Sequence, residues 1–288
     1  MSTNSIQRSF IPGDKWVYYK IYCGINTADS LLTKTIAPLS DKLVKDDLID
    51  QWFFIRYVDP DQHLRVRFHL KDTAFIGKVM ETIKASLDTY IKSQLVRDLQ
   101  IATYHREIER YGENTIEVLE SYFYEDTKVI IKIIEESPTE EVRFDRVLKF
   151  LDQITNLFLP NLETKLIFLE RLQLSYKTEF KINNFGKKTL GKKYRSFKGE
   201  SDTSTLKIDL SSFKSIHNTL EKLHKKGQLE IPIESLLASI VHMHVNRVFQ
   251  ARQRLYEMVL YDFLYQKNKS AYYKEKKIKL SDRSNTSS

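Results

Sequence analysis

Four basic residues alternate with four apolar ones in segment 63–70, which reads His-Leu-Arg-Val-Arg-Phe-His-Leu. Successive side chains of a β-strand point to opposite faces, so the alternation predicts a strand with an apolar face and a basic face. The basic members are His63, Arg65, Arg67 and His69. Such a row could bind an anion, or it could be the solvated face of an ordinary half-buried antiparallel strand. Arg56, on the strand predicted just before it, would add a fifth cation to the same hairpin.

A second segment, 103–112, combines arginines with carboxylates. Glu107 and Arg110 lie three residues apart, so a helical turn would place them on one face, where they can pair. That pair could orient the guanidinium for binding, or it could be an exposed ion pair worth under about 1 kcal/mol.

A third segment, 239–247, falls in a long helix predicted to begin near Pro232. Helical spacing puts His242 on one face with Asn246, and Arg247 lies about one residue further round. A single helical histidine is usually structural, but a histidine grouped with an amide and a guanidinium is a candidate for proton transfer.

Several classes of site are excluded. The histidines do not have the spacing of metal ligands, and the chain lacks both a glycine-rich phosphate loop and a Gly-x-Ser-x-Gly elbow. The single cysteine, Cys23, falls in an apolar strand and is interpreted as a buried structural thiol. We therefore expect no metal and no cofactor.

The chain of 288 residues has a formal net charge of +8. Much of the excess lies in 187–198 and 267–279, which are interpreted as a solvated loop and tail, with RNA contact by the tail as the alternative. DNA is not expected as a partner. No targeting segment and no apolar run of about 20 residues is present, so we expect a soluble cytoplasmic protein without an integral membrane segment.

The periodicity predicts an α+β fold in which a small antiparallel sheet from the N-terminal third packs against a larger helical part. A single domain is expected over 1–266, sheet-rich in 14–112 and helical in 113–266, followed by a flexible basic tail, 267–288. Ser137-Pro138-Thr139-Glu140 predicts a helix start capped by Ser137. Residues 186–204 are predicted to be a polar loop. The predicted strands are 16–23, 52–58, 63–70 and 99–104, and the predicted helices are 26–48, 73–94, 137–159, 161–177, 209–225 and 233–266.

Over residues 14–265 the chain resembles the C-terminal, glutamate-eliminating domain of lantibiotic dehydratases, also called the thiopeptide-type bacteriocin biosynthesis domain. The order of the motifs carries the resemblance. The motifs are Trp16-x-Tyr18-x-Lys20-Ile21-Tyr22, Phe54-x-Arg56-Tyr57-x-Asp59-Pro60, His63-Leu64-Arg65-x-Arg67, Tyr104-x-Arg106-Glu107-x-x-Arg110-Tyr111-Gly112 and His242-Met243-x-x-Asn246-Arg247.

The resemblance implies a carbon–oxygen lyase that eliminates glutamate from glutamylated Ser or Thr of a ribosomal precursor peptide, giving dehydroalanine or dehydrobutyrine. It implies that Arg67, Arg110 and His242 are catalytic. Whether His242 or Glu107 is the base is left open. The residues expected to bind substrate are Arg56, Arg65, Glu107, Asn246 and Arg247.

The resemblance also implies partners: the precursor peptide, a separate tRNA-dependent glutamylating dehydratase subunit, and in some systems a cyclase. One alternative is the [4+2] cycloaddition that forms the pyridine of thiopeptides, which a branch of the family carries out. Another is a non-catalytic scaffold that binds peptide or RNA. For elimination, Arg67, Arg110 and His242 must converge in one cleft, which we expect between the sheet and the helices.

Overall fold

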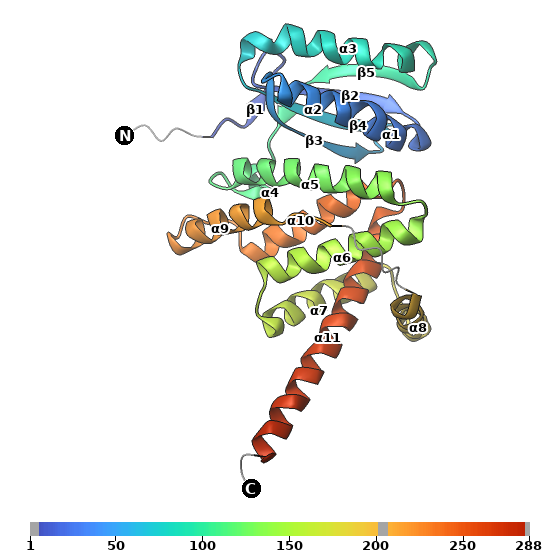
Figure 1. The fold of residues 1–288 in the computed structure, drawn as a ribbon, viewed down its shortest axis with the longest axis vertical. Helices are drawn as coiled ribbons and strands as arrows, with labels where there is room; N and C mark the ends of the chain where they lie inside the picture. Colours follow the sequence, from blue (N-terminus) through green and yellow to red (C-terminus); the bar gives the residue numbers. More distant parts are fainter. Residues whose placement is uncertain (1–5, 201–206, 286–288) are drawn as a thin grey trace. The chain divides into compact units, whose positions relative to one another are not determined.

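The computed structural model describes residues 6–200 and 207–285, and its fold is α+β, as predicted (Figure 1). The chain divides into two compact units, Met1–Pro138 with Ile208–Ala251, and Thr139–Lys207 with Arg252–Ser288. The first unit contains both the sheet and several helices. No described helix combines the length and the apolar character that crossing a bilayer requires.

The first unit is built around a four-stranded antiparallel sheet of order β3-β4-β2-β5. β4 occupies a central position, so both of its edges are paired. A second, two-stranded sheet joins β1 to β6. The strands are β1 (Ser9–Phe10), β2 (Trp16–Cys23), β3 (Ile49–Tyr57), β4 (His63–Leu70), β5 (Val96–Ala102) and β6 (Tyr104–His105).

Helices of the first unit pack on this sheet. α2 contacts β3, α3 contacts β5, and α5 and α10 both contact β3. The helices are α1 (Ile25–Leu31), a π-helical turn (Leu32–Ile36), α2 (Ala37–Lys45), a 3-10 turn (Thr73–Phe75), α3 (Ile76–Lys92), α4 (Ile108–Tyr111), α5 (Ile116–Glu136), α9 (Ser211–Lys225) and α10 (Ile233–Val248). The predicted helix 26–48 is thus present, with a π turn in its middle.

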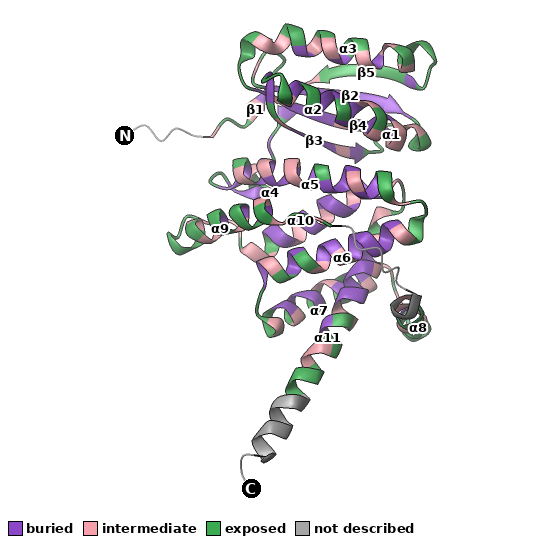
Figure 2. Cartoon of the chain, in the orientation of Figure 1, coloured by how far each residue is buried: buried purple, intermediate pink, exposed green. Residues whose placement is uncertain are grey.

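The basic strand was predicted at its exact bounds, but it is not half-solvated. Its apolar residues are buried, and His63 and Arg67 on the other face are buried as well, at 3% and 6% exposure (Figure 2). The Arg67 face is covered by α5, where Phe53 of β3 contacts Phe123 with ring centroids 5.6 Å apart. The row is therefore an interior feature for part of its length.

The second unit is helical and consists of α6 (Glu140–Phe158), α7 (Leu162–Glu179), α8 (Asn184–Glu200) and α11 (Gln253–Asn285). α6 is capped by Thr139, whose hydroxyl accepts from the Val142 amide at 3.3 Å, and not by Ser137 as predicted. Ser137 instead ends α5, where its amide donates to the Ile133 carbonyl at 3.1 Å, and the extended Thr139 comes directly before the first helical residue.

Two further predictions in this region were wrong. The predicted loop 186–204 is helical through Glu200, and residues 201–206 lie outside the described residues. The helix forms because Leu190, Tyr194 and Phe197 recur at helical spacing. Leu190 is buried, and the rings of Tyr194 and Phe197 pack against Phe263. The predicted helix 233–266 is interrupted at 249–252, where Arg252 adopts a φ of 56°.

The predicted tail is also helical, since α11 continues to Asn285, and residues 286–288 lie outside the described residues. Once its first turns are formed, a helix of Lys and Glu residues extends at little cost, because each added residue adds one hydrogen bond.

Candidate active site

Arg67 lies at the centre of the sheet, paired with Tyr18 of β2 on one side and Phe53 of β3 on the other. Its guanidinium carbon lies 4.6 Å, 5.2 Å and 4.7 Å from the ring centroids of Tyr18, Phe53 and Tyr104. These cation–π contacts hold the charge between aromatic faces. No carboxylate among the described residues forms an ion pair with it.

The Nε and Nη1 atoms of Arg67 are buried and have no hydrogen-bond partner within the described part of the chain. Burial lowers the pKa of Arg67, since desolvation penalises the charged form. Unused donors on a buried guanidinium are costly, because buried polar groups are normally paired. An anion bound here would satisfy them.

Arg67 lines a small cavity of about 20 Å³, together with Tyr104, Glu107, Tyr111 and Met243. The space admits about one water-sized group, such as an oxygen atom of a ligand. Its walls come from β3, β4, the segment before α4, α5 and α10. Glu107, whose side chain is 58% exposed, gives the cavity an edge at the surface.

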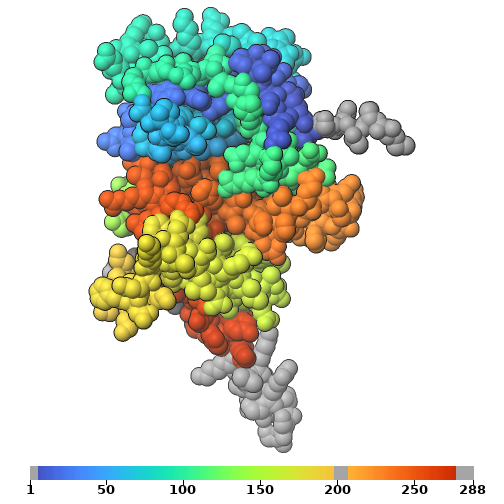
Figure 3. Space-filling view, turned by 180° about the vertical axis from the view of Figure 1, so that it is seen from behind, coloured from blue at the N-terminus to red at the C-terminus, as the bar shows by residue number. Residues whose placement is uncertain are grey.

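The short helix α4 contributes Tyr111 to this cavity and carries Arg110, which contacts α10. Nη1 of Arg110 lies 3.5 Å from Oε2 of Glu107, so the predicted pair is present, and Nε donates to Oγ of Ser239 at 3.2 Å. Ser239 is three residues before His242 on α10, so these two side chains share a face of that helix. Figure 3 shows the segment around α4 in contact with the α9–α10 region on the molecular surface.

A buried ion pair anchors the segment that carries Glu107 and Arg110. Arg106 donates to Glu120 of α5 through Nε at 2.8 Å and Nη2 at 2.6 Å, a two-point contact that fixes the guanidinium plane. The hydroxyl of Tyr104 donates to the same carboxylate at 2.8 Å. Burial raises the pKa of Tyr104 well above its ordinary value, so this hydroxyl stays protonated.

Comparisons with known proteins agree on one family. The family model described as "Lantibiotic biosynthesis dehydratase C-term" matches residues 16–268. The chain belongs to this family. The matched region contains Arg67, Arg110 and His242.

Among curated proteins, the chain is similar to the subtilin biosynthesis protein SpaB of Bacillus subtilis, with 30% identity over 87% of the chain and 25% of SpaB. It is also similar to the nisin biosynthesis protein NisB of Lactococcus lactis subsp. lactis, with 25% identity over 88% of the chain and 26% of NisB. The chain thus spans about a quarter of the length of these relatives.

Two solved structures share the fold. The tRNA-dependent lantibiotic dehydratase MibB from Microbispora sp. 107891 has a TM-score of 0.67 at 18% identity, over 90% of the chain and 29% of MibB. The pyridine synthase TbtD, from thiomuracin biosynthesis, has a TM-score of 0.63 at 12% identity, over 88% of the chain and 99% of TbtD.

Two residues that the family resemblance suggested for substrate binding lie in the interior of this dehydratase-family unit. Arg247 is fully buried, pairs with Asp126 and donates to the Phe123 carbonyl at 3.1 Å. Arg56 pairs with Asp29 and donates to the Arg247 carbonyl at 2.7 Å. These contacts favour a structural role for both arginines, because buried guanidinium groups need such partners.

Arg65 and Asn246 remain available to a ligand. Arg65 is half-buried, stacks 3.4 Å from the Tyr57 ring centroid and donates to Nε2 of His63 at 3.1 Å. Asn246, one helical turn after His242, is half-buried, and its Oδ1 has no hydrogen-bond partner in residues 6–200 and 207–285.

Sequence reasoning missed Tyr18, Phe53 and Tyr111 as parts of the site. Tyr18 and Phe53 meet Arg67 only through strand register, which no local spacing reveals. Ser239 was detectable, since it precedes His242 by three residues on the predicted helix.

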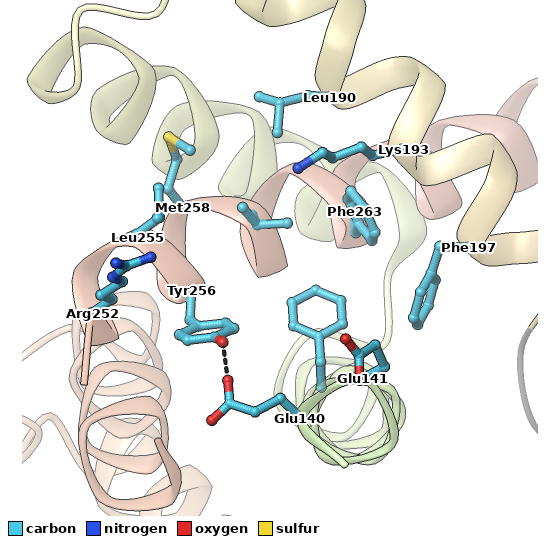
Figure 4. Close-up of a pocket in the computed structure, with 12 residues that line it drawn as sticks. Glu140, Glu141, Leu190, Lys193, Phe197, Arg252, Leu255, Tyr256, Met258 and Phe263 are labelled. Atoms are coloured by element: carbon cyan, nitrogen blue, oxygen red, sulfur yellow. Dashed lines mark hydrogen bonds between the residues drawn. The ribbon is translucent and has the colours of Figure 1, made fainter. Parts of the chain in front are cut away.

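A cavity of about 460 Å³ in the second unit is a different kind of feature. Its walls are apolar and aromatic, with Phe144, Tyr256 and Phe263 around it and Glu140 and Lys193 among its polar groups (Figure 4). The Tyr256 hydroxyl donates to Glu140. None of the sequence-predicted site residues lines it.

Proposed function

We propose that this protein is a lyase that eliminates glutamate from glutamylated Ser or Thr of a ribosomal precursor peptide, leaving dehydroalanine or dehydrobutyrine. Membership of the dehydratase family supports the proposal. The observation that carries it is the buried Arg67 guanidinium, whose Nε and Nη1 have no hydrogen-bond partner in residues 6–200 and 207–285, in a cavity that Glu107 also lines. Glu107 contacts Arg110, and Arg110 donates to Ser239, which shares a face of α10 with His242.

The reaction needs a base, a site for developing negative charge and a site for the leaving carboxylate. The base removes the proton from Cα, the electron pair of that bond forms the Cα=Cβ double bond, and the Cβ–O bond breaks. Glutamate leaves with the second electron pair as a carboxylate. Charge builds on the amide oxygen as the proton departs, and a preorganised donor in a dry site stabilises it most. Arg67 has that environment.

Arg110 suits the leaving glutamate. Its side chain is 34% exposed and is held by Glu107 and Ser239, so it can meet a carboxylate that arrives from solvent. Guanidinium groups bind carboxylates through two parallel hydrogen bonds, and two arginines can hold the two carboxylates of glutamate. Arg65 is the second candidate.

For the base we propose His242, with Glu107 as the alternative. His242 is half-buried and shares a helix face with Ser239, which binds Arg110. Glu107 lines the cavity with Arg67 but is also paired with Arg110. His242→Ala should let glutamylated peptide accumulate while peptide binding is retained, and Glu107→Gln should retain proton transfer. The reverse result would exchange the two roles.

Elimination consumes a glutamyl ester, so a glutamylation reaction must precede it. We propose a separate tRNA-dependent glutamylating subunit as the supplier in the cytoplasm, and in lanthipeptide systems a cyclase as the consumer of the dehydrated product.

A cycloaddition is the second candidate function, because the fold spans nearly the whole of the pyridine synthase TbtD. Two incubations separate the candidates. Glutamylated peptide should lose glutamate with the purified protein, whereas a cycloaddition enzyme would leave it intact and convert an already dehydrated peptide. A peptide- or RNA-binding scaffold would change neither peptide.

A further inference from the structure

Tyr111 is the other buried residue of the cavity with an unused hydrogen-bonding group. It is 3% exposed, lines the same cavity as Arg67, and its hydroxyl has no hydrogen-bond partner in the described part of the chain. Arg67 and Tyr111 thus bring three polar atoms without a partner among the described residues to one small space lined by aromatic and aliphatic side chains. Such a concentration of unpaired groups is unusual in a folded interior.

The Tyr111 side chain is fixed in place although its hydroxyl is free. The ring packs edge-on against Phe123, with centroids 5.5 Å apart and planes at 72°, and the Arg110 guanidinium carbon lies 5.4 Å from its centroid. The backbone amide donates to the Glu107 carbonyl at 3.1 Å, and the Tyr111 carbonyl accepts from the Thr115 hydroxyl. The ring and the backbone of Tyr111 are both held in place, so the position of its hydroxyl is preorganised.

Burial raises the pKa of Tyr111 to about 12. The hydroxyl is therefore protonated at neutral pH and can act as a donor, as Arg67 can.

We propose that the Tyr111 hydroxyl is a catalytic donor that acts with Arg67 to bind an anionic oxygen of the substrate. The inference rests on the proposed elimination and deepens it. The oxygen is either the enolate-like oxygen formed when the Cα proton leaves or a carboxylate oxygen of the departing glutamate. Both offer the same chemistry, a negatively charged oxygen that accepts two or more hydrogen bonds.

The Tyr111→Phe substitution tests this, because it removes only the hydroxyl and breaks no hydrogen bond of the described chain. We expect the thermal midpoint to stay equal or rise and kcat for glutamate release to fall about 100-fold. Tyr261→Phe is the matched control. Tyr261 of α11 is 1% exposed and also has an unpaired buried hydroxyl among the described residues, but it lies outside this cavity. Its activity should equal that of the wild type.

Inhibition by free glutamate separates the two sources of the anionic oxygen. A lower kcat with unchanged inhibition assigns the hydroxyl to the enolate-like oxygen, and a lower kcat with weaker inhibition assigns it to the carboxylate. Wild-type activity in Tyr111→Phe overturns the inference, as does a fall in its thermal midpoint that accounts for the lost activity. A wild-type protein that releases no glutamate contradicts the proposed function itself.

Discussion

The guanidinium carbon of Arg67 lies 4.7 Å from the ring centroid of Tyr104, while the hydroxyl of Tyr104 donates to Glu120 at 2.8 Å. The ring face of Tyr104 thus contacts a cation that has no carboxylate partner among the described residues, while its hydroxyl donates to the carboxylate that pairs with Arg106. Glu120 pairs with Arg106, whereas Nε and Nη1 of Arg67 have no acceptor in the part of the chain that the structure describes. The two buried arginines therefore differ in their surroundings, and we expect opposite effects on stability when each is removed.

Arg67→Met should fold as well as the wild type. Methionine retains most of the packing volume, and removing a buried charge without an ion-pair partner offsets the lost cation–π contacts. We expect the free energy of unfolding in urea to change by less than about 1 kcal/mol. A loss of several kcal/mol would show that Arg67 supports the fold.

Arg106→Met should behave in the opposite way. It leaves the Glu120 carboxylate buried at 1% exposure, with the Tyr104 hydroxyl as its remaining hydrogen-bond donor among the described residues, so unfolding free energy should fall by about 3–5 kcal/mol. The double variant Arg106→Met with Glu120→Leu should recover much of the loss. Arg8→Ala, at the exposed Arg8–Glu109 pair, is the control and should leave stability unchanged. If Arg106→Met and Arg8→Ala lowered the unfolding free energy equally, burial of the Arg106–Glu120 pair would not explain the effect.

Gly112→Ala should destabilise the end of α4. Gly112 has a φ of 82°, and an added Cβ would lie 2.5 Å from Oε2 of Glu230 and 2.8 Å from Oγ1 of Thr115. We expect the free energy of unfolding to fall by more than about 2 kcal/mol. Elimination should also be slower, because Arg110 lies on the same helix. Gly227 has a φ of 67°, and an added Cβ there would meet no atom within 4 Å. Gly227→Ala therefore measures the cost of the backbone conformation alone, which we expect to be about 1 kcal/mol. Similar losses at both positions would exclude the steric contribution.

His63 should make stability depend on pH. Burial lowers its pKa below the ordinary 6.5, and Nε2 accepts from Arg65, so the folded protein holds the neutral imidazole. The unfolded chain takes up a proton first as the pH falls, so stability is complete above about pH 6.5 and declines below it. Thermal midpoints from about pH 7.5 to about pH 5 should fall less steeply in His63→Gln than in the wild type. If the thermal midpoints of His63→Gln and the wild type fell in parallel as the pH decreased, His63 would not be a source of the pH dependence.

The sequence predicted the strands well because alternation is a local signal, and β4 matches its prediction at both ends. It did not predict that the basic face is covered, because the covering helices α5 and α10 come from distant segments. The same limit applied to the site. The Glu107–Arg110 pair could be predicted because the two residues are three apart in the sequence. The contacts of Arg67 with Tyr18 and Phe53 depend on how β4 aligns with β2 and β3, which the sequence does not reveal. The α8 prediction failed because lysine and glycine content outweighed a helical spacing of apolar residues.

Incubation of the purified protein with a glutamylated precursor peptide, followed by mass spectrometry, tests the central claim most directly. The wild type should release one glutamate per ester and leave a dehydrated residue at each modified Ser or Thr. Arg67→Met, folded to the same extent, should leave the ester intact. Unchanged glutamylated peptide with the wild type, or wild-type release by Arg67→Met, would contradict the claim.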